Sequence, residues 1–118
     1  MNLKIIKVYS HGVLDEEYVE ITATSDCEIG KYLVSKSTNS LDGIVTNRLR
    51  YVYWFPDKKI SKGDSIQLYT KMGQNCVTNN IDGKTIHTFY WNKLKAIWND
   101  TGESVMLFKI IKWRHRKT

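Results

Sequence analysis

The chain has 118 residues, of which 42% are hydrophobic and 25% charged, and it contains a single proline. This length suits one domain, and the composition excludes a disordered or linker-rich chain. The net charge is +6, and the whole excess lies in residues 60–118, which hold ten basic and four acidic residues, whereas residues 1–59 hold eight of each. Such an imbalance suits either an anionic partner or a solubilising surface.

The sequence also disfavours a membrane protein and a fold stabilised by disulfides. No apolar stretch approaches the roughly 18 residues that span a bilayer, and no signal peptide opens the sequence. We therefore expect a soluble, cytoplasmic protein. Cys27 and Cys76 form no CxxC motif, which excludes a zinc ribbon. We interpret both as reduced, partly buried thiols.

The first predicted elements are strands. Residues 3–9 are rich in β-branched and aromatic residues, which favour a strand. In residues 17–24 the apolar side chains Val19, Ile21 and Ala23 alternate with polar ones. A period of two with one apolar face predicts a half-buried strand.

A third short strand is expected at residues 32–34. The polar residues 35–47 predict a loop or the end of a long hairpin. Residues 48–55 form the next strand, which Pro56 ends because proline cannot donate to a sheet ladder. A further strand surrounds Ile66 and Leu68.

The last third of the chain continues this pattern. Residues 73–88 hold two short strands around the turn dipeptide Asp82-Gly83. Residues 92–98 could form one helical turn, and residues 104–113 predict the final strand. No helix-period segment of ten residues occurs, so the pattern favours an all-β sandwich or barrel.

Trp98 stands directly before the polar turn that ends at Gly102. A large ring beside a chain reversal can close the end of a two-layer core. We expect a structural role for five residues: Trp98, Asn99, Gly102, Phe55 and Pro56.

Four segments in this order resemble the lamin-tail domain, the immunoglobulin-like module of nuclear intermediate-filament proteins that many bacterial proteins also carry. They are Glu17-Tyr18-Val19-Glu20-Ile21, then Phe55-Pro56 with Ile60 and Gly63, then Trp98-Asn99-Asp100-Thr101-Gly102-Glu103, and finally Val105 with Leu107. The chain departs from the family at Lys31-Tyr32, where the family has Gly-Trp, so it resembles a distant bacterial-type member.

The resemblance implies an immunoglobulin-like antiparallel β-sandwich over residues 1–113, followed by a basic tail at residues 114–118. It also implies the absence of catalysis and cofactor, and a role in protein or nucleic-acid interaction.

Catalytic and metal sites find little support in the residues themselves. A Cys76–His87 pair would need the fold to bring the two together, and no nucleophile signature surrounds either cysteine. His11 lies in a turn and His115 in the basic tail. The acidic cluster of Asp15, Glu16, Glu17 and Glu20 lacks calcium-loop spacing, and we interpret it as a solvated face. We expect no catalytic residue, no metal and no cofactor.

Basic and aromatic residues interleave in residues 48–59, where exposed rings could stack on bases. Strand alternation allows only one set to be free: Tyr51, Tyr53 and Phe55 face one way, and Arg50, Val52 and Trp54 the other. The short basic tail is the better phosphate candidate. The candidate nucleic-acid-binding residues are Arg48, Arg50, Lys112, Arg114, Arg116 and Lys117.

The sequence therefore predicts a non-catalytic module that binds another protein through a sandwich surface, with a nucleic-acid-binding domain as the alternative. Open sandwich edges can accept an added strand from a protein partner. The oligomeric state stays open.

Overall fold

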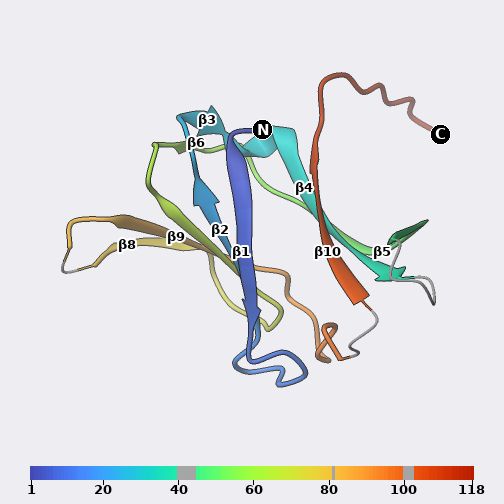
Figure 1. Cartoon of the computed structure of the whole chain (residues 1–118). Coiled ribbons are helices and arrows are strands. Elements are labelled where there is room, and N and C mark those ends of the chain that lie inside the picture. The colour runs from blue at the N-terminus through green and yellow to red at the C-terminus, as the bar shows by residue number, and fades with distance from the viewer. Residues whose placement is uncertain (40–44, 81, 100–102) are drawn as a thin grey trace.

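The computed structural model describes residues 1–39, 45–80, 82–99 and 103–118, and these residues form an all-β sandwich of ten strands with one short 3₁₀ turn (Figure 1). The predicted fold class is therefore confirmed. The strands form a five-stranded sheet, a three-stranded sheet and a small two-stranded pair.

The five-stranded sheet has the order β1-β2-β7-β9-β8. Its strands are β1 (Leu3–Tyr9), β2 (Tyr18–Ala23), β7 (Ser65–Tyr69), β8 (Cys76–Asn79) and β9 (Thr85–Tyr90). The chain leaves β7 for the far edge and returns as the predicted hairpin, so β9 lies beside β7 in the same direction. This parallel pair departs from the purely antiparallel arrangement that we expected. The β8–β9 hairpin extends beyond the other strands (Figure 1).

The three-stranded sheet has the order β10-β4-β5. It contains β4 (Tyr32–Asn39), β5 (Val45–Trp54) and β10 (Glu103–Lys109), while β3 (Cys27–Glu28) pairs with β6 (Lys59–Ile60) beside the 3₁₀ turn Ile29–Lys31. Of the two predictions for residues 35–47, the loop is wrong at residues 35–39 and 45–47, which belong to strands, and the end of a long hairpin is confirmed, because β4 and β5 pair antiparallel as far as Asn39 and Val45. β4 is the central strand and has ladder partners on both sides. The polar side chains of β4 are also satisfied: the Ser35 and Ser37 hydroxyls each donate to a β5 carbonyl at 3.1 Å.

The core lies between the two larger sheets. Val19, Ile21 and Ala23 are buried, as their alternation predicted, and Ile66 and Leu68 of β7 join them. Tyr32 also fills the core, only 1% exposed. Its hydroxyl accepts a hydrogen bond from the Asn2 backbone at 3.3 Å, which satisfies the polar end of the ring.

Aromatic rings close one end of this core through edge-to-face contacts. Phe55 contacts Tyr53 and Phe89 at 5.1 Å between ring centroids, and Trp91 continues the cluster to Trp98 at 6.3 Å. Trp98 is 4% exposed, so the predicted burial of this ring is confirmed. Two further residues were expected to have a structural role. Pro56 is exposed and follows the end of β5, whereas Gly102 lies outside the described residues.

Residues 92–98 form no helical turn, contrary to the prediction. Their backbone N–H groups bond to other segments instead: Lys93 donates to the Thr70 carbonyl at 2.8 Å, and Ile97 donates to the Glu17 carboxylate at 2.9 Å. The last strand is also shorter than predicted. It ends at Lys109, and the Ile110 N–H then bonds to the Lys31 carbonyl.

The prediction that Glu17 lies on a solvated acidic face is wrong, because its side chain is fully buried. Its carboxylate accepts hydrogen bonds from the backbone of Gly12, from the Thr70 hydroxyl and from the backbone of Ile97. Three donors from three separate loops compensate for the loss of hydration that a buried carboxylate suffers.

Four tyrosines cross the outer face of the five-stranded sheet as a stacked row, one from each of four neighbouring strands. Tyr9 and Tyr18 lie 4.9 Å apart, Tyr18 and Tyr69 4.7 Å, and Tyr69 and Tyr90 5.7 Å. The Tyr9–Tyr18 and Tyr69–Tyr90 pairs are stacked and the Tyr18–Tyr69 pair is tilted, so the facing ring surfaces contact one another within the protein. Cross-strand aromatic pairs of this kind stabilise a sheet.

We predict that Trp98→Ala lowers the free energy of unfolding by roughly 3–5 kcal/mol, because it empties the closed end of the core. Chemical denaturation measures this loss. Trp113→Ala is the matched control, since that ring is 60% exposed and its loss should change stability by less than about 1 kcal/mol. Equal effects of the two substitutions would contradict the assigned burial.

Ionisation of the tyrosine row at alkaline pH should lower the stability of the folded protein. The pKa of Tyr9 is raised mainly by its hydrogen bond to Glu20, and the pKa of Tyr18 is raised by burial and then by the Glu20 charge. Burial also raises the pKa of Tyr69. A raised pKa in the folded state means that this stability is fully present below the unfolded tyrosine pKa of about 10 and is lost as the pH rises through the folded values.

Replacing Glu20 by Gln should lower the pKa of Tyr9 and Tyr18, and ultraviolet titration of tyrosinate measures this change. The control Glu16→Gln removes a carboxylate from an exposed site outside the row. An unchanged titration of Glu20→Gln, or an equal shift in the control, would contradict this origin of the raised pKa values.

Candidate interaction surface

The outer face of the three-stranded sheet is largely apolar. Strand register places Phe108, Leu33 and Trp54 in one row across β10, β4 and β5. The next row contains Met106 and Val52 on either side of Ser35. We name this surface the β4–β5–β10 face and define it by the five apolar residues of these two rows and by Leu49.

Three of its side chains are strongly exposed: Leu49 is 44% exposed, Val52 52% and Trp54 46%. The solvent side of an antiparallel sheet usually carries polar residues in alternation with a buried apolar face. On β5 the side opposite to this face packs into the core through Tyr53, so both sides of the strand carry apolar residues. A contiguous exposed apolar face of this kind marks an interaction site more often than a solvated surface does.

The C-terminal segment lies against this face through a pair of tryptophans. Trp113 contacts Trp54 edge-to-face at 5.1 Å between centroids. The indole N–H of Trp54 donates to the Gly30 carbonyl at 2.7 Å, which holds the inner ring of the pair in place. After β10 the tail continues past the end of the strand and arches away to the C-terminus (Figure 1).

This contact places the basic tail beside Trp54, whereas Arg48 and Arg50 lie farther along β5, toward its start at Val45. The exposed candidates on β5 are Arg48 and Arg50, and those on the tail are Lys112, Arg114, Arg116 and Lys117. Within the described residues of β4, β5, β10 and the tail, Glu103 is the only acidic residue, and it pairs with Lys36. The apolar face therefore has a strongly basic rim.

Tyr51 departs from the strict alternation that the sequence predicted for β5. Ser35 pairs with Val52 and Lys36 pairs with Arg50, so Tyr51 is the extra residue of a β-bulge. Its φ is +53°, in the left-handed region that favours glycine. Holding a non-glycine residue there costs about 1–3 kcal/mol.

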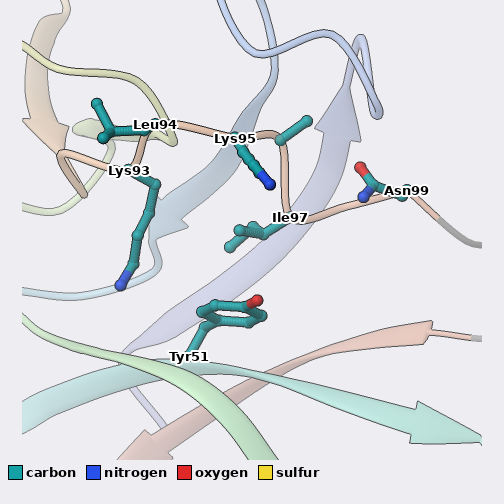
Figure 2. Close-up of a pocket in the computed structure, with 7 residues that line it drawn as sticks. Tyr51, Lys93, Leu94, Lys95, Ile97 and Asn99 are labelled. Atoms are coloured by element: carbon teal, nitrogen blue, oxygen red, sulfur yellow. The ribbon is translucent and has the colours of Figure 1, made fainter.

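The ring of Tyr51 forms one wall of a hollow of about 340 Å³. Residues 93–97 and Asn99 form the rest of the lining. Figure 2 shows Ile97 across from the ring, with Lys93 reaching down beside it and Asn99 at the other end. The predicted turn residue Asn99 thus also borders a pocket.

Positive charge surrounds this ring. The ammonium of Lys93 lies 5.4 Å from the ring centroid of Tyr51, and that of Lys36 lies 5.5 Å from it. Lys36 pairs with Glu103, whereas neither Lys93 nor Lys95 forms an ion pair within the described part of the chain. The hollow therefore combines an aromatic wall with two lysines that lack a carboxylate partner there.

The fold separates the residues of the Cys–His hypothesis. Cys76 pairs with Thr88, while His87 pairs with Val77, so the cysteine and the histidine belong to opposite faces of the sheet. His87 is buried against Asp64 at 2.8 Å. Cys27 and Cys76 are both free, but Cys76 is exposed, contrary to the expected partial burial, because β8 is an edge strand.

The described residues hold no group of three or more His, Cys, Asp or Glu side chains that could bind a metal ion. The described part of the chain also contains no helix with the length and hydrophobicity that a membrane crossing requires.

Sequence reasoning missed the pocket at Tyr51. Lys93, Leu94 and Lys95 carry no motif, and alternation placed Tyr51 on the same side of β5 as Tyr53 and Phe55. A bulge has no reliable signature in a single sequence, so no local signal identifies this site.

Comparisons with known proteins add no family assignment. No protein-family model matches the chain, and no curated protein matches it either. Membership of the lamin-tail family therefore stays a prediction from the quoted segments.

Proposed function

We propose that this protein is a non-catalytic interaction module that binds an acidic protein partner through the β4–β5–β10 face. The observation that carries the proposal is the exposed apolar face with a basic rim. Apolar contact supplies the driving force for association, and the rim selects a partner whose apolar segment is flanked by carboxylates.

Two further features support a protein partner. β5 and β10 are the edge strands of the three-stranded sheet, so either edge can accept an added strand. The exposed tryptophan pair also suits this role, because Trp is the residue type most enriched among the residues that dominate interface energies.

The lamin-tail resemblance is consistent with this proposal, since it implies interaction without catalysis. The separation of Cys76 from His87 supports the absence of a catalytic pair at these two residues. The two free cysteines are consistent with a reducing compartment, and we propose a cytoplasmic location.

A photo-crosslinking amino acid at Val52 tests the protein-binding proposal. Val77 is the matched control, because it has nearly the same exposure, 47%, but lies on β8 of the other sheet. In lysate of the source cell, position 52 should crosslink to a partner segment that mass spectrometry identifies as apolar and flanked by Asp or Glu. Trp113→Ala should weaken this crosslink. A basic partner segment, or the same products from position 77, would contradict the proposal.

A nucleic-acid-binding domain is the second candidate, and the basic tail beside the exposed rings of Trp54 and Trp113 favours it, with Arg48 and Arg50 exposed farther along β5. Exposed rings can stack on bases while Arg and Lys contact phosphates. This arrangement would suit single strands better than duplex, because paired bases are not accessible to the rings.

Fluorescence titration with single-stranded and duplex DNA at low and high salt tests this candidate. Binding should weaken steeply with salt, and replacing Arg114, Arg116 and Lys117 together by Ala should reduce the slope of log K against log salt by about two to three. The matched control replaces Lys62, Lys71 and Lys84, which belong to other surfaces. Undetectable binding at low salt would remove the candidate.

A further inference from the structure

We infer that the hollow at Tyr51 is an anchor pocket for the C-terminal residue of the partner, with an apolar side chain against Tyr51 and Ile97 and its carboxylate between Lys93 and Lys95. This inference rests on the proposed function, because it identifies the part of the protein partner that is recognised. The volume of about 340 Å³ is at the lower end of the usual range for ligand sites.

The first argument is the conformation of Tyr51. Its φ of +53° would be relaxed in glycine, yet the ring at this position is 47% exposed and fills no core space. Strained residues of this kind gather at ligand clamps, where the surrounding structure holds them in place. The ring therefore has a role outside the folding of the domain.

The second argument is charge. The hollow presents two lysines without a carboxylate partner among the described residues, and none of the described residues that line it is acidic. An anion is the occupant that this arrangement favours. The ammonium of Lys93 lies over the Tyr51 ring, so positive charge and apolar contact meet at one point.

The third argument is rigidity. The wall opposite Tyr51 is held by the backbone of Lys93, which bonds to Thr70, and by that of Ile97, which bonds to buried Glu17. The pocket is thus formed before binding, which lowers the entropic penalty of association. An internal Asp or Glu carries no apolar bulk of its own, whereas a C-terminal residue carries both an apolar side chain and a carboxylate.

Three small probes test the inference by NMR: N-acetyl-L-phenylalanine, its amide, and acetyl-Asp-Phe-amide. The free acid should shift the backbone signals of residues 93–99, and its affinity should exceed that of the neutral amide by about tenfold, because only the acid can meet both lysines. Equal binding of acid and amide, or no shift in these residues, would overturn the pocket. Stronger binding of acetyl-Asp-Phe-amide would overturn the C-terminal assignment.

Variants separate recognition from folding. Lys93→Gln with Lys95→Gln should weaken binding of the acid about tenfold, whereas the control pair Lys62→Gln with Lys84→Gln should not. Tyr51→Gly and Tyr51→Asn should abolish binding while the denaturation midpoint stays equal or rises, because both residues tolerate positive φ. A large loss of stability in both variants would show that the ring serves the fold, and would overturn the inference.

The two proposals fail in different ways. If the probes do not bind but position 52 still crosslinks to an acidic partner, the pocket is wrong and the interaction face stands. If the acid binds as described but position 52 does not crosslink to an acidic partner, the interaction face is wrong and the pocket stands.

Discussion

The buried carboxylate of Glu17 holds together the end of the sandwich at which the Tyr51 pocket lies. It accepts hydrogen bonds from the loop after β1, from the segment after β7 and from the segment before β10, through Gly12, Thr70 and Ile97. Thr70 and Ile97 are remote from Glu17 in sequence, so the carboxylate joins segments that no local turn could connect. Without it, these two buried donors would lose their acceptor, and each loss would cost roughly 1–3 kcal/mol.

The outer faces of the two sheets differ in how far their side chains are covered. The five-stranded sheet stacks Tyr9, Tyr18, Tyr69 and Tyr90 on one another, which leaves their ring faces occupied. The three-stranded sheet leaves Val52 and much of Trp54 exposed. This difference supports assigning the proposed interaction to the three-stranded sheet, where exposed apolar residues lie next to the basic tail.

Polar side chains of the central strand β4 connect the strands that carry the proposed interaction face. Ser35 and Ser37 bond to carbonyls of β5, and Lys36 pairs with Glu103 of β10, so β4 connects both edge strands through its side chains as well as its backbone. The bulge at Tyr51 lies within this network. Tyr51, the strand wall of the proposed pocket, therefore belongs to the same sheet as the apolar face, whereas residues 93–99 form the opposite wall.

The sequence by itself determined the fold class, most strand positions and the burial of Val19, Ile21 and Trp98, because alternation and turn residues act locally. The charge imbalance and the candidate basic residues could also be identified from the sequence alone. Only the tertiary structure decided the burial of Glu17, the strand character of residues 35–39, the parallel β7–β9 pair and the pocket at Tyr51. Each of these depends on partners distant in the chain: a buried carboxylate needs donors from other loops, a polar strand needs neighbours on both sides, and a bulge is defined by the strand that it opposes.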